Sequence, residues 1–138
     1  MASDIKITVT NRSGRQTASS GSKWEPIMGY SRAVRHGNMI VVTGTVGVNA
    51  DGKYPPSMAD QTRRSLAIIQ AAVEALGGRI SDVVRTRMFV TDVSKWEEVA
   101  KVHGEVFAEI RPATSILEVA KLIDADARIE IEADAVMP

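Results

Sequence analysis

The amino-terminal half of the chain alternates between apolar and polar residues in three short stretches. The first, over residues 5–10, is typical of a short half-exposed strand. The other two stretches, residues 30–35 and 39–46, flank a His36-Gly37-Asn38 connection. Because glycine and asparagine accept positive φ angles, this connection predicts a β-hairpin.

The same period of two returns near the carboxyl terminus and predicts strands over residues 84–91, 113–122 and 128–136. In the first of these, Val84, Thr86, Met88 and Val90 share one face, and Arg85, Arg87, Phe89 and Thr91 share the other. In the last, the apolar set is Ile129, Ile131, Ala133 and Ala135, which leaves Glu130, Glu132 and Asp134 on an uncovered face. If these two strands are neighbours, we expect Arg85 and Arg87 to pair with the carboxylates.

Two segments have the period of a helix instead. The first begins after Ser57, has Asp60 three residues later, and ends at Gly77-Gly78. Its apolar stripe is Thr62, Leu66, Ile69, Val73 and Leu76. The second helix is predicted to begin after an N-cap at Ser94 and to turn five residues inward: Trp96, Val99, His103, Val106 and Ile110.

The order of elements predicts one α+β domain over residues 24–138, a two-layer sandwich of a mixed β-sheet with two helices on one face. Residues 1–23 are predicted to be a strand followed by a flexible segment. The Ser/Gly/Arg-rich stretch over residues 11–23 has no period and favours a mobile connection.

Composition narrows the function classes. The chain of 138 residues contains no cysteine, which excludes disulfides and thiol nucleophiles. Its 17 basic and 17 acidic residues give no net charge, so a nucleic-acid partner is not expected. The two histidines, His36 and His103, have no carboxylate at ligand spacing, and neither a metal nor a cofactor is predicted. No apolar run is long enough to span a membrane, and we expect a cytoplasmic protein.

Two carboxyl-terminal motifs, Pro112-Ala113-Thr114-Ser115 and Glu130-Ile131-Glu132-Ala133, resemble the signature of the Rid family (RidA/YjgF, reactive intermediate deaminases). Residues 37–44 and 89–93 extend the resemblance. It implies a barrel-like homotrimer with a small-molecule ligand at each subunit interface. We expect the trimer to bury a sheet face that carries Phe89, Ile116 and Val136.

The resemblance also implies roles for single residues. Glu130 matches the glutamate that orients the attacking water, Tyr30 matches a pocket tyrosine, and Thr43 with Gly44 matches a Ser-Gly pair. Thr114, however, stands where the family has an arginine that binds the substrate carboxylate. Ile116 occupies the position of a frequent cysteine.

A carboxylate suits imine hydrolysis because it can take a proton from water as the water attacks the C=N carbon. Threonine cannot replace a bidentate arginine, whose contact contributes about 1.5–3 kcal/mol. Arg87 is the best substitute on the face of Glu130, although a structural salt bridge is the simpler interpretation. His103 is interpreted either as a packed histidine or as an acid or base at the pocket wall. Arg32 and Arg35 on the first hairpin are weaker candidates for the substitute cation, and solvated surface residues are the simpler interpretation.

The sequence therefore predicts a RidA-like hydrolase (deaminase) of imines, enamines or related small electrophilic metabolites, with altered substrate specificity. The alternative is a non-catalytic trimer that binds a small molecule or a partner. Glu130 is the predicted catalytic residue, and the predicted substrate-binding residues are Tyr30, Thr43, Arg87, His103, Thr114 and Ile116.

Overall fold

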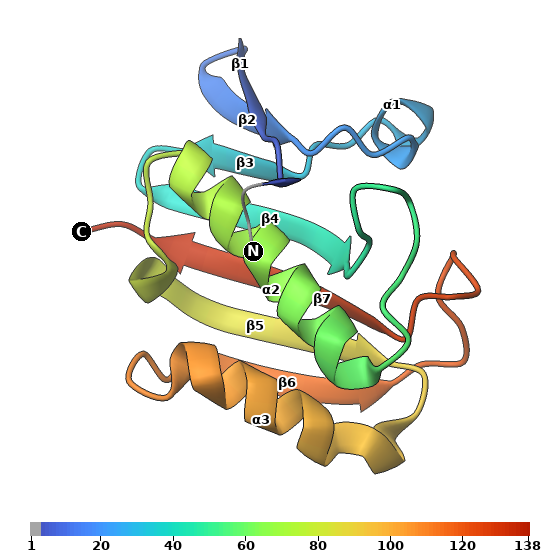
Figure 1. The fold of residues 1–138 in the computed structure, drawn as a ribbon. Helices are drawn as coiled ribbons and strands as arrows, with labels where there is room; N and C mark the ends of the chain where they lie inside the picture. Colours follow the sequence, from blue (N-terminus) through green and yellow to red (C-terminus); the bar gives the residue numbers. More distant parts are fainter. Residues whose placement is uncertain (1–3) are drawn as a thin grey trace.

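The computed structural model describes residues 4–138 as one mixed sheet with two long helices packed on the same face (Figure 1). The seven strands follow the order β1-β2-β3-β4-β7-β5-β6, and only β5 and β6 are parallel. This confirms the predicted α+β sandwich. The strands are β1 (Thr8–Arg12), β2 (Arg15–Ser19), β3 (Ala33–His36), β4 (Met39–Val46), β5 (Val83–Val90), β6 (Ala113–Glu118) and β7 (Ile129–Val136). The helices are α1 (Trp24–Met28), α2 (Met58–Ala75) and α3 (Trp96–Phe107), with short 3₁₀ turns at Ile80–Asp82 and Val93–Lys95.

Helix α2 forms as its sequence predicts. The Ser57 hydroxyl accepts a hydrogen bond from the Asp60 backbone N–H at 3.0 Å, which caps the first turn. All five residues of the predicted stripe are buried beneath the helix. Gly77 then takes a φ of 91°, a conformation that glycine adopts without strain, and the helix stops.

Helix α3 begins differently from the prediction. Ser94 is not its N-cap, because the Asp92 carboxylate accepts hydrogen bonds from the Ser94 N–H and hydroxyl, at 3.0 and 2.6 Å, and holds this residue in a 3₁₀ turn. Trp96, the first helical residue, is 52% exposed, and its predicted burial was wrong. The buried residues of the helix are Val99, Val102 and Phe107. Of the other predicted inward residues, Val99 is buried and Val106 and Ile110 pack against the core, so the stripe begins at Val99, one turn after Trp96.

The alternation along β5 is interrupted once. A register shift against β7 between Val83 and Arg85 turns Val83 into the core and leaves Val84 47% exposed. The prediction that Val84 faces inward was wrong for this reason, since a bulge inserts one residue into the alternation. From Thr86 onward the predicted inward set is buried.

Residues 8–19 form a hairpin, although the sequence predicted a strand over residues 5–10 followed by a mobile connection. Ser13 and Gly14 have φ angles of 49° and 81°, which suit a tight two-residue hairpin turn. Strand β2 pairs with β3, and Ala18 is 1% exposed in the core. The hairpin is thus part of the same sheet. The prediction failed because the pairing of β2 with β3 is not visible in a local period.

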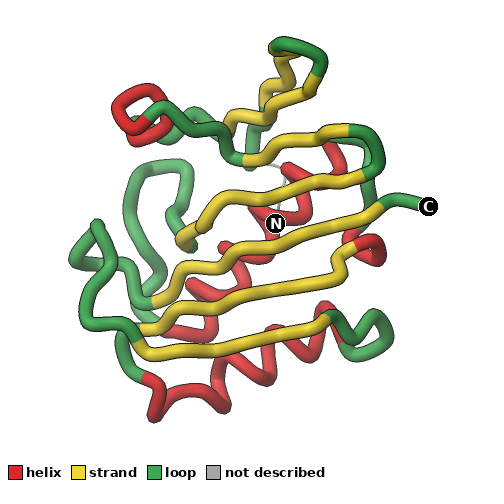
Figure 2. Tube along the Cα trace, turned by 180° about the vertical axis from the view of Figure 1, so that it is seen from behind, coloured by secondary structure: helices red, strands yellow, loops and turns green. Residues whose placement is uncertain are grey.

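Figure 2 shows that no helix of residues 4–138 covers the other face of the sheet, which we call the open face. It carries the alternate residues of β7, Glu130, Glu132, Asp134 and Val136, and their cross-strand neighbours. The predicted inward residues of β7 are fully buried. Among the described residues, no helix is long and apolar enough to cross a membrane.

One glycine lies at a backbone-to-backbone contact and gives a stability prediction. A Cβ at Gly47 would lie 2.8 Å from the Gln61 Cα and would overlap the Gln61 carbonyl oxygen, so Gly47→Ala should push the start of α2 away from the sheet. We expect a loss of about 1–3 kcal/mol of unfolding free energy, measured by urea denaturation. Gly104→Ala is the matched control, since a Cβ there meets nothing within 4 Å and removes a helical glycine. Equal stability of the two variants would contradict the prediction.

Candidate functional site

The carboxylate of Glu130 lies on the open face at an irregularity of β4. Glu130 pairs with Phe89 on β5 and Val46 on β4, and the β4 register shifts between Val42 and Thr45. Gly44 is in this bulge. A Cβ on Gly44 would lie 2.8 Å from the Glu130 carboxyl carbon and would overlap its Oε2 atom. The missing side chain therefore provides the room for the carboxylate, and Thr43 stands beside it in the bulge.

The surroundings of Glu130 favour a proton acceptor. Burial raises the pKa of its carboxyl group above the ordinary value, the Glu132 carboxylate raises it further, and the Arg32 guanidinium opposes both. Tyr54 lies near, and its pKa is raised by burial and by the Asp124 carboxylate, with a smaller contribution from Glu130. A carboxylate with a raised pKa is a stronger base once it is ionised.

Arg32 is buried, which contradicts its interpretation as a solvated residue. It is 6% exposed, and its Nη1 atom donates to the Gly44 carbonyl at 2.8 Å and to the Thr45 hydroxyl at 3.2 Å. Its Nε atom donates to the Ser20 hydroxyl at 3.1 Å. The reason for the error is tertiary, because the side chain bonds to Ser20, directly after β2, and to Gly44 and Thr45 on β4, which are distant in the sequence. Arg35, by contrast, is half-buried and donates to two backbone carbonyls.

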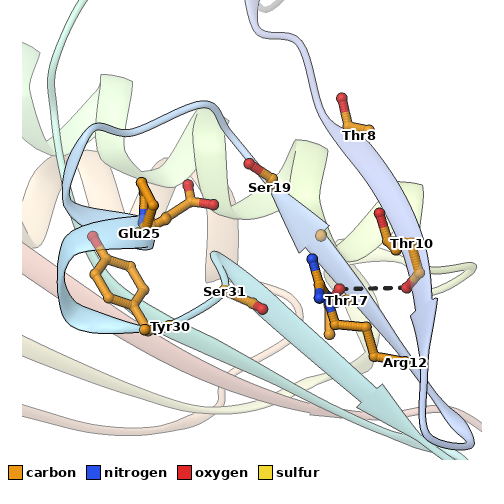
Figure 3. A pocket seen from close by; sticks show the side chains of 11 residues that line it. Thr8, Thr10, Arg12, Thr17, Ser19, Glu25, Tyr30 and Ser31 are labelled. Carbon is orange, nitrogen blue, oxygen red and sulfur yellow. Dashed lines mark hydrogen bonds between the residues drawn. The ribbon is translucent and has the colours of Figure 1, made fainter.

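Tyr30 follows α1 and joins this region to the amino-terminal hairpin. Its hydroxyl accepts a hydrogen bond from the Arg32 Nη2 at 3.4 Å, and its ring centre is 5.5 Å from the guanidinium carbon. Figure 3 shows Tyr30 in the wall of a cavity of about 430 Å³, together with Glu25 and residues of the hairpin. The buried Glu25 carboxylate accepts from the Ser20 N–H and hydroxyl and from the Ser22 N–H.

Arg87 forms the predicted structural salt bridge. Its Nη1 is 3.5 Å from the Glu132 carboxylate and 3.4 Å from that of Asp134, and its side chain is 40% exposed. Exposed pairs of this kind contribute about 0–1 kcal/mol each. Arg87 lies opposite Glu132 on β7, whereas Glu130 lies opposite Phe89. Within the chain, Arg87 therefore pairs with Glu132 and Asp134 and not with Glu130.

Three predicted site residues lie on the helix-covered face instead. Strands β5 and β6 pair Thr86 with Thr114 and Met88 with Ile116, so Thr114 and Ile116 share the side of the buried residues. The Thr86 hydroxyl is 2.9 Å from the His103 Nε2 and 2.8 Å from the Thr114 hydroxyl. The Thr114 hydroxyl also donates to the Pro112 carbonyl at 3.1 Å. The expectation that Ile116 lies on the open face with Phe89 and Val136 was wrong.

The position of His103 in the structure matches the first of its two interpretations, a packed histidine. Its ring lies 4.6 Å from that of Phe107, and burial lowers its pKa, so the imidazole stays neutral at physiological pH. It therefore completes a polar chain of neutral groups with Thr86 and Thr114. Glu130 and these three hydrogen-bonded residues lie on opposite faces of the sheet, and β5 separates the strand of Thr114 from that of Glu130.

Sequence reasoning missed Tyr54 and Thr86 as neighbours of the predicted residues, and it gave Arg32 only as a weaker candidate cation. Thr86 had a visible signal, since it is a polar residue in the inward set of β5. The position of Tyr54 and the burial of Arg32 had none, because neither is set by a local pattern. Within residues 4–138, no cluster of histidine and acidic side chains could hold a metal ion.

The fold and this site define a class: small two-layer α+β proteins that carry a half-buried glutamate on the open face of a mixed sheet. The chain belongs to the family described as Endoribonuclease L-PSP, the YjgF/RidA family, whose profile matches residues 20–137. It is 40% identical over 111 residues to the 2-iminobutanoate/2-iminopropanoate deaminase of Escherichia coli K12, covering 78% of this chain and 86% of that protein.

Solved structures agree with this assignment. Rv2704 of Mycobacterium tuberculosis, a member of the same family, is 47% identical and superposes with a TM-score of 0.83 over 89% of this chain and 99% of its own. Escherichia coli TdcF with bound serine is 32% identical, with a TM-score of 0.74 over 79% of this chain and 88% of its own.

Proposed function

We propose that this protein is a hydrolase that releases ammonia from imines, enamines or related small electrophiles. The observation that carries the proposal is the half-buried Glu130 carboxylate, with its raised pKa, in the space over Gly44. Water adds to the C=N carbon, and Glu130 takes a proton from the water. That proton then passes to nitrogen, which gives the carbinolamine. Glu130 next takes the carbinolamine hydroxyl proton and returns it to nitrogen, so that the C–N bond breaks and ammonia leaves as the carbonyl forms. The name of the Escherichia coli deaminase relative supports this chemistry.

The substrate preference follows from Thr114, the position at which the family resemblance places a carboxylate-binding arginine. The Thr114 hydroxyl is already bonded to Pro112 and contacts Thr86, and it carries no charge. A substrate carboxylate placed there would be partly desolvated without a dedicated cation. We therefore assign to this protein substrates that lack a carboxylate next to the C=N carbon, or that place it elsewhere.

We also propose a homotrimer with the pocket shared between subunits, as the family resemblance implies. The open face leaves large apolar residues 40–48% exposed, namely Met39, Val41, Leu117 and Val136. A second copy of the chain would cover them. It would also bring the Thr114 edge of one subunit toward the Glu130 face of another, which a single chain keeps apart. Light scattering that shows a stable monomer at micromolar concentration would contradict the trimer.

The test of the function is ammonia release from freshly generated imines. An amino acid oxidase would supply imines of ordinary amino acids, an amine oxidase would supply imines without a carboxylate, and an arginine-bearing relative would be assayed alongside. We expect faster turnover of the second group by this protein and of the first group by the relative. No acceleration of either group would favour the non-catalytic binding protein. Equal rates of both proteins on amino acid imines would refute the role assigned to Thr114.

A further inference from the structure

The guanidinium of Arg32 is a buried cation that the proposed chemistry does not yet use. It makes four polar contacts, to Ser20, Gly44, Thr45 and Tyr30. Among residues 4–138, no carboxylate oxygen lies within 4.0 Å of it, so its charge is not neutralised by direct pairing. The contact with Glu25 is indirect, through the Ser20 hydroxyl, which donates to that carboxylate at 3.1 Å. Burying a charge without an ion partner costs free energy, so such a residue is a candidate for a functional role.

Arg32 holds the bulge beneath Glu130 from two sides. Its carbonyl accepts a hydrogen bond from the Thr43 N–H at 2.9 Å, and its Nη1 donates to the Gly44 carbonyl. The Thr45 hydroxyl, which also accepts from Nη1, donates to the Thr43 carbonyl at 2.7 Å. Both residues of the bulge, Thr43 and Gly44, and the adjacent Thr45 are thus held by the side chain and backbone of Arg32, and the Glu130 carboxylate lies directly against Gly44.

The role of Arg32 differs from that of a substrate anchor. At 6% exposure, with each of its three nitrogens already bonded, it offers no open bidentate edge to a substrate carboxylate. Its position suits an action on Glu130 instead. The other titratable groups near Glu130 are Glu132 on the same strand and Tyr54 in the loop before α2, while Arg87 on β5 pairs with Glu132. Arg87 is neutralised by two carboxylates, whereas Arg32 is not.

We propose that Arg32 is the positioning residue of this site: it fixes the β4 bulge that seats Glu130 and supplies a buried positive charge beside that carboxylate. The effect of Arg32 on activity rests on the proposed function, whereas its effects on the β4 bulge and on Glu130 do not. It also gives the amino-terminal hairpin a role, because Ser20, directly after β2, helps to hold the guanidinium.

The test compares Arg32→Gln with Arg35→Gln. Arg35→Gln is the matched control because it removes the same charge. Like Arg32, Arg35 donates to backbone carbonyls, here those of Gly37 and Leu76, at 2.9 and 2.8 Å. Carbon-13 NMR would follow the Glu130 carboxyl titration, with the signal assigned from a Glu130→Gln variant. Removing a nearby positive charge favours the protonated acid, so Arg32→Gln should move the midpoint to higher pH, and Arg35→Gln should leave it unchanged.

Activity gives a second readout. Because Glu130 must be ionised to accept a proton, Arg32→Gln should shift the acid limb of the pH profile of kcat/KM upward and lower the plateau about tenfold or more. Arg32→Lys keeps the charge but loses the planar geometry, so it should lower the plateau with a smaller shift of the limb. This variant also serves if Arg32→Gln fails to fold.

Identical Glu130 midpoints in Arg32→Gln and Arg35→Gln would overturn the inference. If the unmodified protein hydrolyses no imine, the proposed function fails, and the NMR comparison still decides whether Arg32 acts on Glu130. The two failures are therefore distinguishable.

Discussion

Replacing Glu130 by glutamine is expected to lower imine turnover about a hundredfold or more without loss of the fold. Glutamine keeps the size of the side chain over Gly44 but cannot accept a proton from the attacking water. The measurement is kcat/KM for the best imine substrate, together with the oligomeric mass and the midpoint of urea unfolding. Unchanged turnover in a folded variant would remove Glu130 from the mechanism.

Glu132→Gln is the control for this substitution, since Glu132 projects from the same strand and face and pairs with Arg87. The Glu132 carboxylate raises the pKa of Glu130, so its removal should lower that pKa. Glu130 would then stay ionised to lower pH, and the acid limb should move downward, opposite to the shift expected of Arg32→Gln. Turnover at pH 8 should stay near that of the unmodified protein. A loss as large as that of Glu130→Gln would mean that the effect is not specific to Glu130.

Gly44→Ala is expected to reduce activity by about tenfold to a hundredfold through Glu130 itself. The added Cβ would overlap the Glu130 carboxylate, which is the end of a flexible side chain and can swing away. The fold should therefore survive, whereas the carboxylate would leave its position. Gly47→Ala gives the contrast, because its clash is with backbone and should appear in the unfolding free energy.

A double-mutant cycle makes the Gly44 prediction specific. In a Glu130→Gln background, Gly44→Ala should have little further effect on kcat/KM, since the group it displaces no longer acts as a base. Additive losses would show that Gly44→Ala acts by another route, such as a change in the course of β4.

The local periods of apolar and polar residues were sufficient to predict most of the helices and strands of this protein. Helix α2 and strand β7 each have one apolar side. Burying the apolar side turns the polar side chains of the same element away from the core. Glu130, Glu132 and Asp134 therefore had to share the open face, and Arg87 could be expected to meet carboxylates there. The two carboxyl-terminal motifs were specific enough to indicate the family.

The period of a strand, however, says nothing about its neighbours. Strand β5 lies between β6 and β7 and so separates Thr114 from Glu130. The parallel pairing of β5 with β6 places Thr114 beside Thr86, on the face that the helices cover. Strand β6 has no clear apolar side of its own, so its facing could not be read from the sequence. The family resemblance predicted a pocket at each subunit interface, but the sequence did not indicate which of the site residues a single chain keeps on opposite faces of the sheet.

The sequence by itself determined the sandwich, the charged open face and the carboxylate proposed to act as base, because each depends on short-range alternation or on a local motif. Tertiary structure alone decided that residues 8–19 join the sheet, that Arg32 is buried beside the Glu130 bulge, and that Thr114 contacts Thr86 and lies in one polar chain with His103. These features depend on strand pairing and on contacts between segments distant in the chain, which are fixed only when the whole sheet forms.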